Sequence, residues 1–216
     1  MIIRGLPLWV AATNSWIVAA EPDGTAVVID APPQPGAVGR EVDGLGLTVA
    51  AIILTHGHVD HAGGAAMLAE ETSAAVYAHP DDDFLTRNPE EQLRIMFGMT
   101  PPGEYRAPAR VERLSDGQIL DIAGLRLEVR HTPGHTPGHC CLYLEQAETL
   151  FSGDQLFAGS IGRTDLPGGN LGDLLTSMRD RVMTLPDSTR VLPGHGPETT
   201  IGQERRSNPF RPQWET

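Results

Sequence analysis

The sequence predicts an α/β protein in which two β-sheets pack face to face and helices cover the outer surfaces. Two observations indicate this. Turn-separated strand pairs occur in both halves of the 216 residues, and a helical pattern follows each set. Residues 48–54 (TVAAIIL) form a continuous apolar run, which is typical of a strand buried on both faces. No repeat or linker divides the sequence, so we expect residues 1–216 to form a single domain.

The first half is expected to alternate strands with two helices. The turn 21–24 (EPDG) predicts a hairpin between its flanking strands, and three prolines within residues 32–35 predict a loop. The Ala-rich segment 60–72 and the segment 89–97, which begins with Pro and two acidic residues, predict helices. Pro and Gly predict a long loop over residues 98–110. The expected strands are residues 16–20, 26–30, 48–54 and 74–78.

The second half is expected to contain two hairpins, a helix and a final strand. Ala123 and Gly124 form the turn of the first hairpin. Apolar residues recur at helical spacing in residues 171–185, which predicts a helix there. The expected strands are residues 119–122, 125–130, 140–144, 149–152 and 189–192.

Composition limits the partners and the chemistry. The net charge is −12, and all 16 basic residues are arginine. Such a charge repels a phosphate backbone, so we expect no nucleic-acid partner. The absence of lysine excludes a lysine nucleophile or Schiff base. We therefore expect a small-molecule substrate.

The expected location is the cytoplasm, without membrane insertion. The apolar segment 1–20 is interrupted by Gly, Pro and polar residues, so two short strands explain it better than a secretory signal. No run approaches the ~18 apolar residues of a membrane span. Cys140 and Cys141 are adjacent, and neighbours in a strand point to opposite faces, so we expect two buried thiols and no disulfide.

A dense group of metal-binding side chains follows the continuous apolar strand. Six consecutive residues contain His56, His58, Asp60 and His61. Alternate residues of an extended segment point the same way, so His56 and His58 can bind one ion together. Asp60 and His61 come at a helix start and face a second position. Imidazole and carboxylate suit zinc, iron or manganese, and the lack of thiolate argues against a closed structural zinc site.

Three further candidates each follow a predicted strand. His135 lies in HTPGHTPGH, Asp154 in FSGD, and His195 in PGHG. Flanking Gly and Pro fix the backbone path and let it approach an ion closely. Ligands gather at strand ends in layered α/β proteins, so these three residues complete the set.

The string THGHVDH (residues 55–61) resembles the metallo-β-lactamase superfamily signature T-H-x-H-x-D-H. His135, Asp154 and His195 stand where that family has its remaining ligands, and the resemblance extends over residues 14–196. It implies an αββα sandwich of four layers, with the metal site along one edge.

The resemblance also implies a ligand set for two divalent metal ions. The first ion would be held by His56, His58 and His135, the second by Asp60, His61 and His195, and both by the bridging Asp154. Asp60 and His61 are thereby the expected catalytic residues. Two ions ~3.5–4 Å apart would lower the pKa of a shared water toward ~7 and supply hydroxide for attack on an acyl carbonyl. Zinc is the expected metal, with iron and manganese as alternatives.

The surroundings of Asp154 resemble one branch of the superfamily. Its string SGDQLF is similar to hydroxyacylglutathione hydrolases (glyoxalase II), which cleave thioesters, whereas true β-lactamases lack the bridging carboxylate. Residues 159–169 and 204–210 resemble the short bacterial members. The sequence ends about where the helical glutathione-binding domain of full-length glyoxalase II would begin, which leaves the thiol of the substrate open.

Other reactions of the superfamily remain alternatives. Persulfide dioxygenases, which use one iron, are similar in the pattern of His56, His135 and Asp154 and in the string GRTD at residues 162–165. The complete second ligand set favours hydrolysis. Lactone, β-lactam and RNA hydrolysis are lesser alternatives, and the net charge of −12 argues against RNA.

Several polar residues near the motifs are secondary candidates. Arg163 could bind a substrate carboxylate or form a structural ion pair. Asp30, at a strand end, resembles the acid that orients a ligand in this family, and His79 could serve similarly. His131 and His139 flank the ligand loop, and we expect neither to bind metal.

Overall fold

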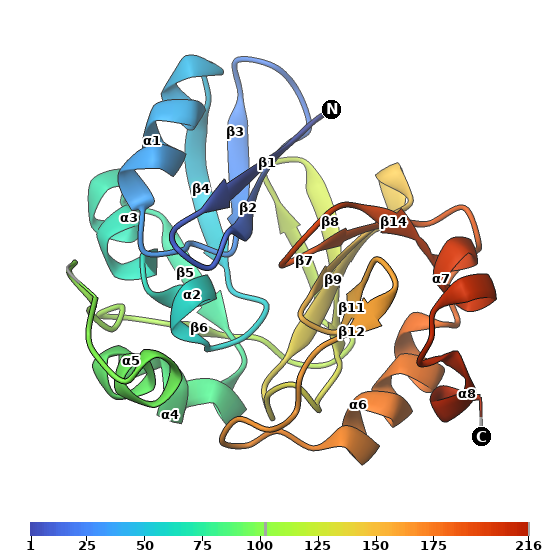
Figure 1. Cartoon of the computed structure of the whole chain (residues 1–216). Helices are drawn as coiled ribbons and strands as arrows, with labels where there is room; N and C mark the ends of the chain where they lie inside the picture. Colours follow the sequence, from blue (N-terminus) through green and yellow to red (C-terminus); the bar gives the residue numbers. More distant parts are fainter. Residues whose placement is uncertain (102, 216) are drawn as a thin grey trace.

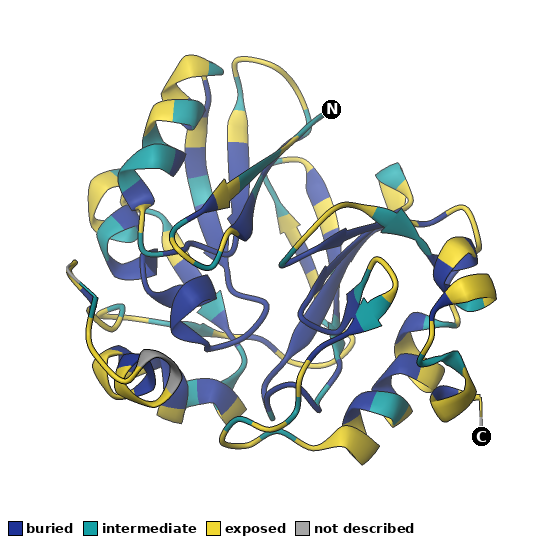
Figure 2. Cartoon of the chain, in the orientation of Figure 1, coloured by how far each residue is buried: buried dark blue, intermediate teal, exposed yellow. Residues whose placement is uncertain are grey.

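The computed structural model describes residues 1–101 and 103–215, without side-chain detail at residues 96 and 97. Two 6-stranded sheets face each other, and helices lie on the outer surface of each sheet (Figure 1). The four layers confirm the predicted αββα arrangement. Residues at the centre of this sandwich are buried, and exposed residues concentrate on the outer helices and the turns (Figure 2).

The first sheet has the strand order β1-β2-β3-β4-β5-β6. Strands β1 to β3 are antiparallel, and β3 to β6 are parallel. Strand β4 lies inside the parallel part, which explains why its sequence is apolar without alternation. The strands are β1 (Ile2–Leu8), β2 (Thr13–Ala19), β3 (Thr25–Ile29), β4 (Thr48–Ile53), β5 (Ala75–Ala78) and β6 (Glu112–Arg113).

The second sheet has the order β14-β13-β10-β9-β8-β7. Strands β7 to β10 form an antiparallel meander that contains both predicted hairpins, and β13 pairs with β10 in parallel. The strands are β7 (Ile119–Ile122), β8 (Leu125–His131), β9 (Cys140–Leu144), β10 (Thr149–Gly153), β13 (Arg190–Pro193) and β14 (Thr199–Thr200), and a separate small pair is β11 (Leu156–Phe157) with β12 (Ser160–Ile161).

Three apolar clusters correspond to the three interfaces between the four layers. Side chains such as Ile53 and Phe151 fill the space between the sheets. Ile52 packs on the other side of the first sheet with Val38 and Leu68 of the outer helices, and Leu150 packs outward from the second sheet. Neighbouring residues of one strand therefore belong to different clusters, as the two-residue period of a strand requires.

The helices differ from the prediction at several places. Pro35 begins helix α1 and does not extend the loop, since proline is tolerated at a first helical position. The expected helix over residues 60–72 is divided into two by Gly63 and Gly64. A side chain at Gly64 would come within 2.1 Å of the Pro32 carbonyl oxygen, so the close backbone contact requires glycine. The helices of this half are α1 (Pro35–Gly44), α2 (Val59–Ala62), α3 (Ala65–Thr72), α4 (Asp83–Thr86) and α5 (Pro89–Phe97).

The C-terminal part contains more structure than the sequence indicated. The predicted helix over residues 171–185 ends as a π-helical turn over Met178–Val182. Two helices after β14 were not predicted, and they cover the second sheet through residues such as Ile201 and Trp214. The helices are α6 (Leu171–Ser177), α7 (Ile201–Ser207) and α8 (Arg211–Trp214). None of the helices in the described part of the chain combines the length and the apolar character that a membrane span requires.

Alkylation should leave both cysteines of the native protein unmodified. Cys140 and Cys141 are fully buried free thiols in different apolar clusters, and burial raises the pKa of Cys141 to about 12. A thiol that is neither exposed nor ionised does not react. Iodoacetamide treatment followed by mass spectrometry should show no modification before unfolding in guanidinium chloride and two afterwards. Modification of a native thiol would contradict this placement.

Candidate metal centre

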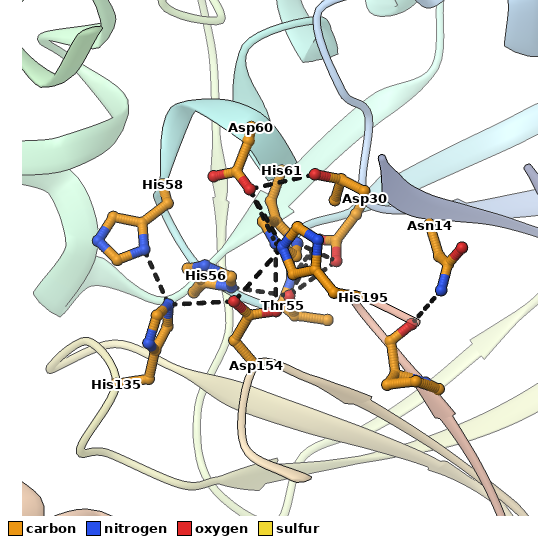
Figure 3. A network of polar contacts seen from close by, with 12 residues as sticks. Asn14, Asp30, Thr55, His56, His58, Asp60, His61, His135, Asp154 and His195 are labelled. Carbon is orange, nitrogen blue, oxygen red and sulfur yellow. Dashed lines mark hydrogen bonds and ion pairs between the residues drawn. The ribbon is translucent and has the colours of Figure 1, made fainter. Parts of the chain in front are cut away.

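The seven predicted ligands come together at one edge of the sandwich, although they are far apart in sequence (Figure 3). Four of them follow β4, and the others follow β8, β10 and β13. All are buried except His195, whose side chain is 30% exposed. This side chain therefore marks the solvent side of the group.

The first triplet consists of His56, His58 and His135. One ring nitrogen from each lies within 4.8 Å of the other two, and His58 Nδ1 is 2.9 Å from His135 Nε2. His56 Nε2 is buried without a hydrogen-bond partner among the described residues. A buried polar atom without a partner is costly in a folded protein. A metal ion bound between the three imidazoles would give this nitrogen a partner, so His56 fits the role of a metal ligand.

The second triplet consists of Asp60, His61 and His195. His195 Nε2 lies 3.2 Å from Asp60 Oδ2 and 3.3 Å from His61 Nε2. One donor atom from each residue lies within 4.8 Å of the other two. A carboxylate with two imidazoles is a donor set for zinc, iron or manganese. The second triplet therefore fits a metal ion as well.

Asp154 lies between the two triplets. Its Oδ2 is 3.5 Å from Nε2 of His135 in the first triplet, and its Oδ1 is 3.3 Å from Nε2 of His61 in the second. A side chain at Gly194 would come within 2.4 Å of Asp154 Oδ1, so glycine permits the close approach of the β13 end. Asp154 therefore contacts both triplets, one through each carboxylate oxygen.

Burial and neighbouring imidazoles keep His56 and His58 of the first triplet unprotonated, as cation binding requires. Burial lowers the pKa of His56 well below its ordinary value. Burial, and then the neighbouring His135, lower the pKa of His58 to about 3. Both rings are therefore neutral at pH 7 and keep a lone pair free, which metal binding requires.

The second triplet is instead a compact set of opposite charges. Burial acts to lower the pKa of His61, but Asp154 and Asp60 outweigh it and raise this pKa well above its ordinary value. Burial acts to raise the pKa of Asp60, but His61 and His195 together outweigh it and leave the pKa at about 2. Burial likewise acts to lower the pKa of His195, but a hydrogen bond to Asp60 and the charge of Asp154 together raise it. Without metal, protons on the imidazoles balance the carboxylates.

Hydrogen bonds fix which ring nitrogen each histidine presents. His61 Nδ1 donates to Asp30 Oδ2 at 2.8 Å. Thr55 Oγ1 donates to the same oxygen and accepts from His56 Nδ1 at 3.0 Å. His135 Nδ1 donates to the Arg163 carbonyl at 2.7 Å. Each of the three rings thereby turns Nε2 toward the site, which is the usual arrangement around a metal.

Asp82 is a residue of the site that sequence reasoning missed. It is 1% exposed, and its carboxylate accepts hydrogen bonds of 2.7 Å from Gly57 N, Thr136 Oγ1 and Gly138 N. Gly57 separates two ligands of the first triplet, and Thr136 follows the third ligand directly. One carboxylate thus joins the two loops that make the first triplet. Nothing in the run of three aspartates at 81–83 distinguishes this one in the sequence.

Other contacts that position the ligands also involve distant segments. Thr13 Oγ1 donates to Asp60 Oδ2 at 3.1 Å, and Asn14 Nδ2 donates to the carbonyl groups on both sides of the loop that carries His195. His139 Nε2 accepts the backbone N–H of Asp154 at 3.1 Å. His139 therefore contacts the ligand set through the backbone.

The side chains of two secondary candidates lie outside the ligand contacts described above. His79 stacks on His131, with ring centroids 4.1 Å apart, and its Nδ1 accepts from the backbone of Asp81. The Arg163 side chain is 59% exposed and forms an ion pair with Asp165, with Nε 2.7 Å from Oδ1. The contact of Arg163 with the site is made by its carbonyl group.

Comparisons of sequence place these residues in a known context. A family model described as the metallo-beta-lactamase superfamily matches residues 8–195. A protein of Mycobacterium tuberculosis is 42% identical over 220 residues, which cover 97% of both chains. The hydroxyacylglutathione hydrolase GloC of Haemophilus influenzae is 38% identical over 186 residues, which cover 86% of both chains.

Solved structures agree with these matches. The BLEG-1 B3 metallo-beta-lactamase superposes with a TM-score of 0.90 and 36% identity, covering 97% of this chain and 99% of that one. The protein TTHA1623, solved in a di-iron-bound form, superposes with a TM-score of 0.85 and 39% identity, covering 96% of this chain and 99% of that one.

Proposed function

Because the chain belongs to the metallo-beta-lactamase superfamily, we propose that it is a hydrolase that binds two metal ions and cleaves a small-molecule thioester, as glyoxalase II does. The observation that carries this proposal is the complete pair of triplets with Asp154 between them. The similarity to a hydroxyacylglutathione hydrolase supports the thioester. The net charge of −12 supports a small molecule over nucleic acid as the partner.

We propose that the first ion is held by His56, His58 and His135, the second by Asp60, His61 and His195, and both by Asp154. Two such ions would activate a water molecule as nucleophile and polarise the acyl oxygen of the substrate. Zinc suits the donor set, and the di-iron form of TTHA1623 keeps iron among the candidates.

The protein's own part in the reaction is to hold this donor set rigid. Asp30 and Thr55 fix the rings of His61 and His56, and the Arg163 carbonyl fixes that of His135. Ligands held by buried partners keep their geometry when the substrate binds, so little reorganisation is needed at the reaction step. Asp60 and Asp154, both ionised, would balance part of the charge of the cations.

Metal content and substrate turnover test this proposal together. Protein purified without chelator should contain about two ions per chain and hydrolyse S-lactoylglutathione or another thioester. A single iron, no thioester turnover and oxygen uptake with glutathione persulfide would instead identify a mononuclear dioxygenase. That result would remove the second metal site from the proposal.

Acidification should release the second ion before the first. The raised pKa values of His61 and His195 mean that protons compete with metal there near neutral pH, whereas the lowered pKa values of His56 and His58 prevent this competition until the solution is far more acidic. Dialysis at decreasing pH should therefore lower the content from about two ions at pH 8 to about one near pH 6.

Ligand variants identify which ion is lost. In His195→Gln the first triplet is intact, so the remaining ion should dissociate only at the lower of the two pH values at which the unsubstituted protein releases its ions. In His58→Gln the remaining ion is held by the second triplet and should dissociate at the higher of these two pH values. Loss of both ions at one pH in the unsubstituted protein would contradict the separate behaviour of the triplets.

A further inference from the structure

A pocket of about 360 Å³ lies beside the first triplet. His58 forms one part of its wall, so the pocket continues from the metal centre toward helices α4 and α5. Its other described lining residues are Phe84, Leu85, Asn88, Glu91, Gln92, Ile95, Leu166 and Pro167. A concave site that opens onto reactive groups is the usual place for a substrate.

The lining is mostly apolar and partly open to solvent. Phe84 and Ile95 are 45% and 55% exposed, which is unusual for large apolar side chains on one wall. Leu166 and Pro167, on the loop after the Arg163–Asp165 ion pair, also line the pocket. Apolar side chains held open around a cavity can bury an apolar part of a ligand.

The polar groups of the pocket do not suit an anion. The side-chain amide of Gln92 is used by the backbone of Gly57, Val59 and Leu85. Among the described lining residues, Glu91 is the one acidic group, none is an arginine, and the one imidazole, that of His58, belongs to the first triplet. A carboxylate at the end of an arm that extends from the metal centre along this pocket would meet the like charge of Glu91 and find no arginine in the lining.

Basic residues near the pocket are paired with acids. Arg87 Nη2 lies 2.7 Å from Asp83 Oδ2, and the Arg163 guanidinium holds both carboxylate oxygens of Asp165. Recruiting either guanidinium for a ligand carboxylate would break an existing pair. The pocket thus lacks the bidentate cation site by which proteins usually recognise carboxylates.

We infer that this pocket binds an uncharged, apolar arm of the substrate and selects against an arm that ends in a carboxylate, as glutathione does. The inference rests on the proposed thioester hydrolysis and adds the substrate class. The arm belongs to either the acyl group or the thiol, since both offer the same chemistry to the pocket.

Binding of three thioethers tests the pocket directly. The compounds are S-ethyl-N-acetylcysteamine, S-octyl-N-acetylcysteamine and 8-(2-acetamidoethylthio)octanoic acid. Burial of the longer chain should make the octyl compound bind at least about tenfold more tightly than the ethyl compound. The terminal carboxylate should remove most of that gain. Equal dissociation constants for the three compounds, measured by calorimetry on the metal-loaded protein, would overturn the inference.

Two charge reversals on helix α5 provide a matched pair. Glu91 lines the pocket, whereas the adjacent Glu90 is not among its lining residues and pairs with Arg94. Glu91→Arg should tighten binding of the carboxylate compound about tenfold, because it replaces a like charge with an opposite one. Glu90→Arg makes the same change in net charge and should leave the preference as it was. An equal response of both variants would show that net charge, and not this pocket, sets the preference.

Turnover then identifies the arm and separates the two proposals. If kcat/KM is higher for S-octanoyl-N-acetylcysteamine than for S-acetyl-N-acetylcysteamine, the pocket binds the acyl group. If kcat/KM is higher for S-octyl thioacetate than for S-ethyl thioacetate, the pocket binds the thiol. Preference for S-lactoylglutathione over both long esters overturns the inference but retains thioester hydrolysis. If no thioester is cleaved, the proposed function fails, while the thioether constants still decide whether the pocket selects an uncharged apolar arm.

Discussion

Replacement of Asp154 by alanine should lower thioester kcat/KM by more than about 100-fold, because loss of an outer partner of a metal ligand alone typically costs about 10–100-fold. Asp154 contacts both triplets, at 3.5 Å from His135 and 3.3 Å from His61. Its removal deprives both proposed ions of a ligand. Metal analysis should show fewer than two ions per chain, and kinetics should show the fall mainly in kcat.

The control for this variant is Asp165→Ala, in which the lost carboxylate is exposed and paired with Arg163. Its metal content should equal that of the unsubstituted protein. Asp154→Asn retains one oxygen in place and should show an intermediate metal content. Full activity and two ions in Asp154→Ala would disprove the shared-ligand arrangement.

Replacement of Asp82 by alanine should reduce kcat/KM about 10–100-fold, the range for removal of a partner that orients metal ligands. Asp82 touches no proposed ion, but its carboxylate joins the loops of His56, His58 and His135 through three hydrogen bonds. Loss of the carboxylate leaves buried Gly57 and Gly138 N–H groups without their acceptor. The first triplet should then hold its ion more weakly, and the affinity for this ion should fall together with kcat.

Asp81→Ala is the matched control, since Asp81 adjoins Asp82 and its side chain is 56% exposed. It should retain activity and metal affinity. Asp82→Asn keeps an oxygen acceptor and should recover part of both. If Asp82→Ala lowers the melting temperature while metal affinity and kcat remain unchanged, Asp82 stabilises the fold without positioning the triplet.

The sequence predicts the elements that are determined by residue patterns within one short segment. Strand β4 is recognisable because burial on both faces makes it apolar throughout, and the hairpins are recognisable by their turns. The cluster of residues 56–61 stands out because neighbours in sequence are also neighbours at the site. These signals need no knowledge of distant contacts.

The features that the sequence did not predict depend on distant partners. Helix α7 packs on the second sheet through Ile201, and the break between α2 and α3 occurs where Gly64 meets the carbonyl groups of residues 31 and 32. Asp82 became a candidate only when the fold placed it against Gly57 and Gly138, 25 and 56 residues away. Each depends on tertiary contacts that periodicity and turn composition do not encode.

The contact between the two ends of the chain has a consequence for biosynthesis. Asn14 Nδ2 donates a hydrogen bond to the Pro193 carbonyl, 179 residues later. Thr13 forms an isolated antiparallel β-bridge with His195. A ribosome releases the N-terminal strands long before it adds His195, because domains emerge from their N-terminus at about 5–20 residues per second. The nascent chain therefore contains the first triplet and Asp154 while the second triplet still lacks its last member. The second triplet can therefore form only after synthesis has passed residue 195.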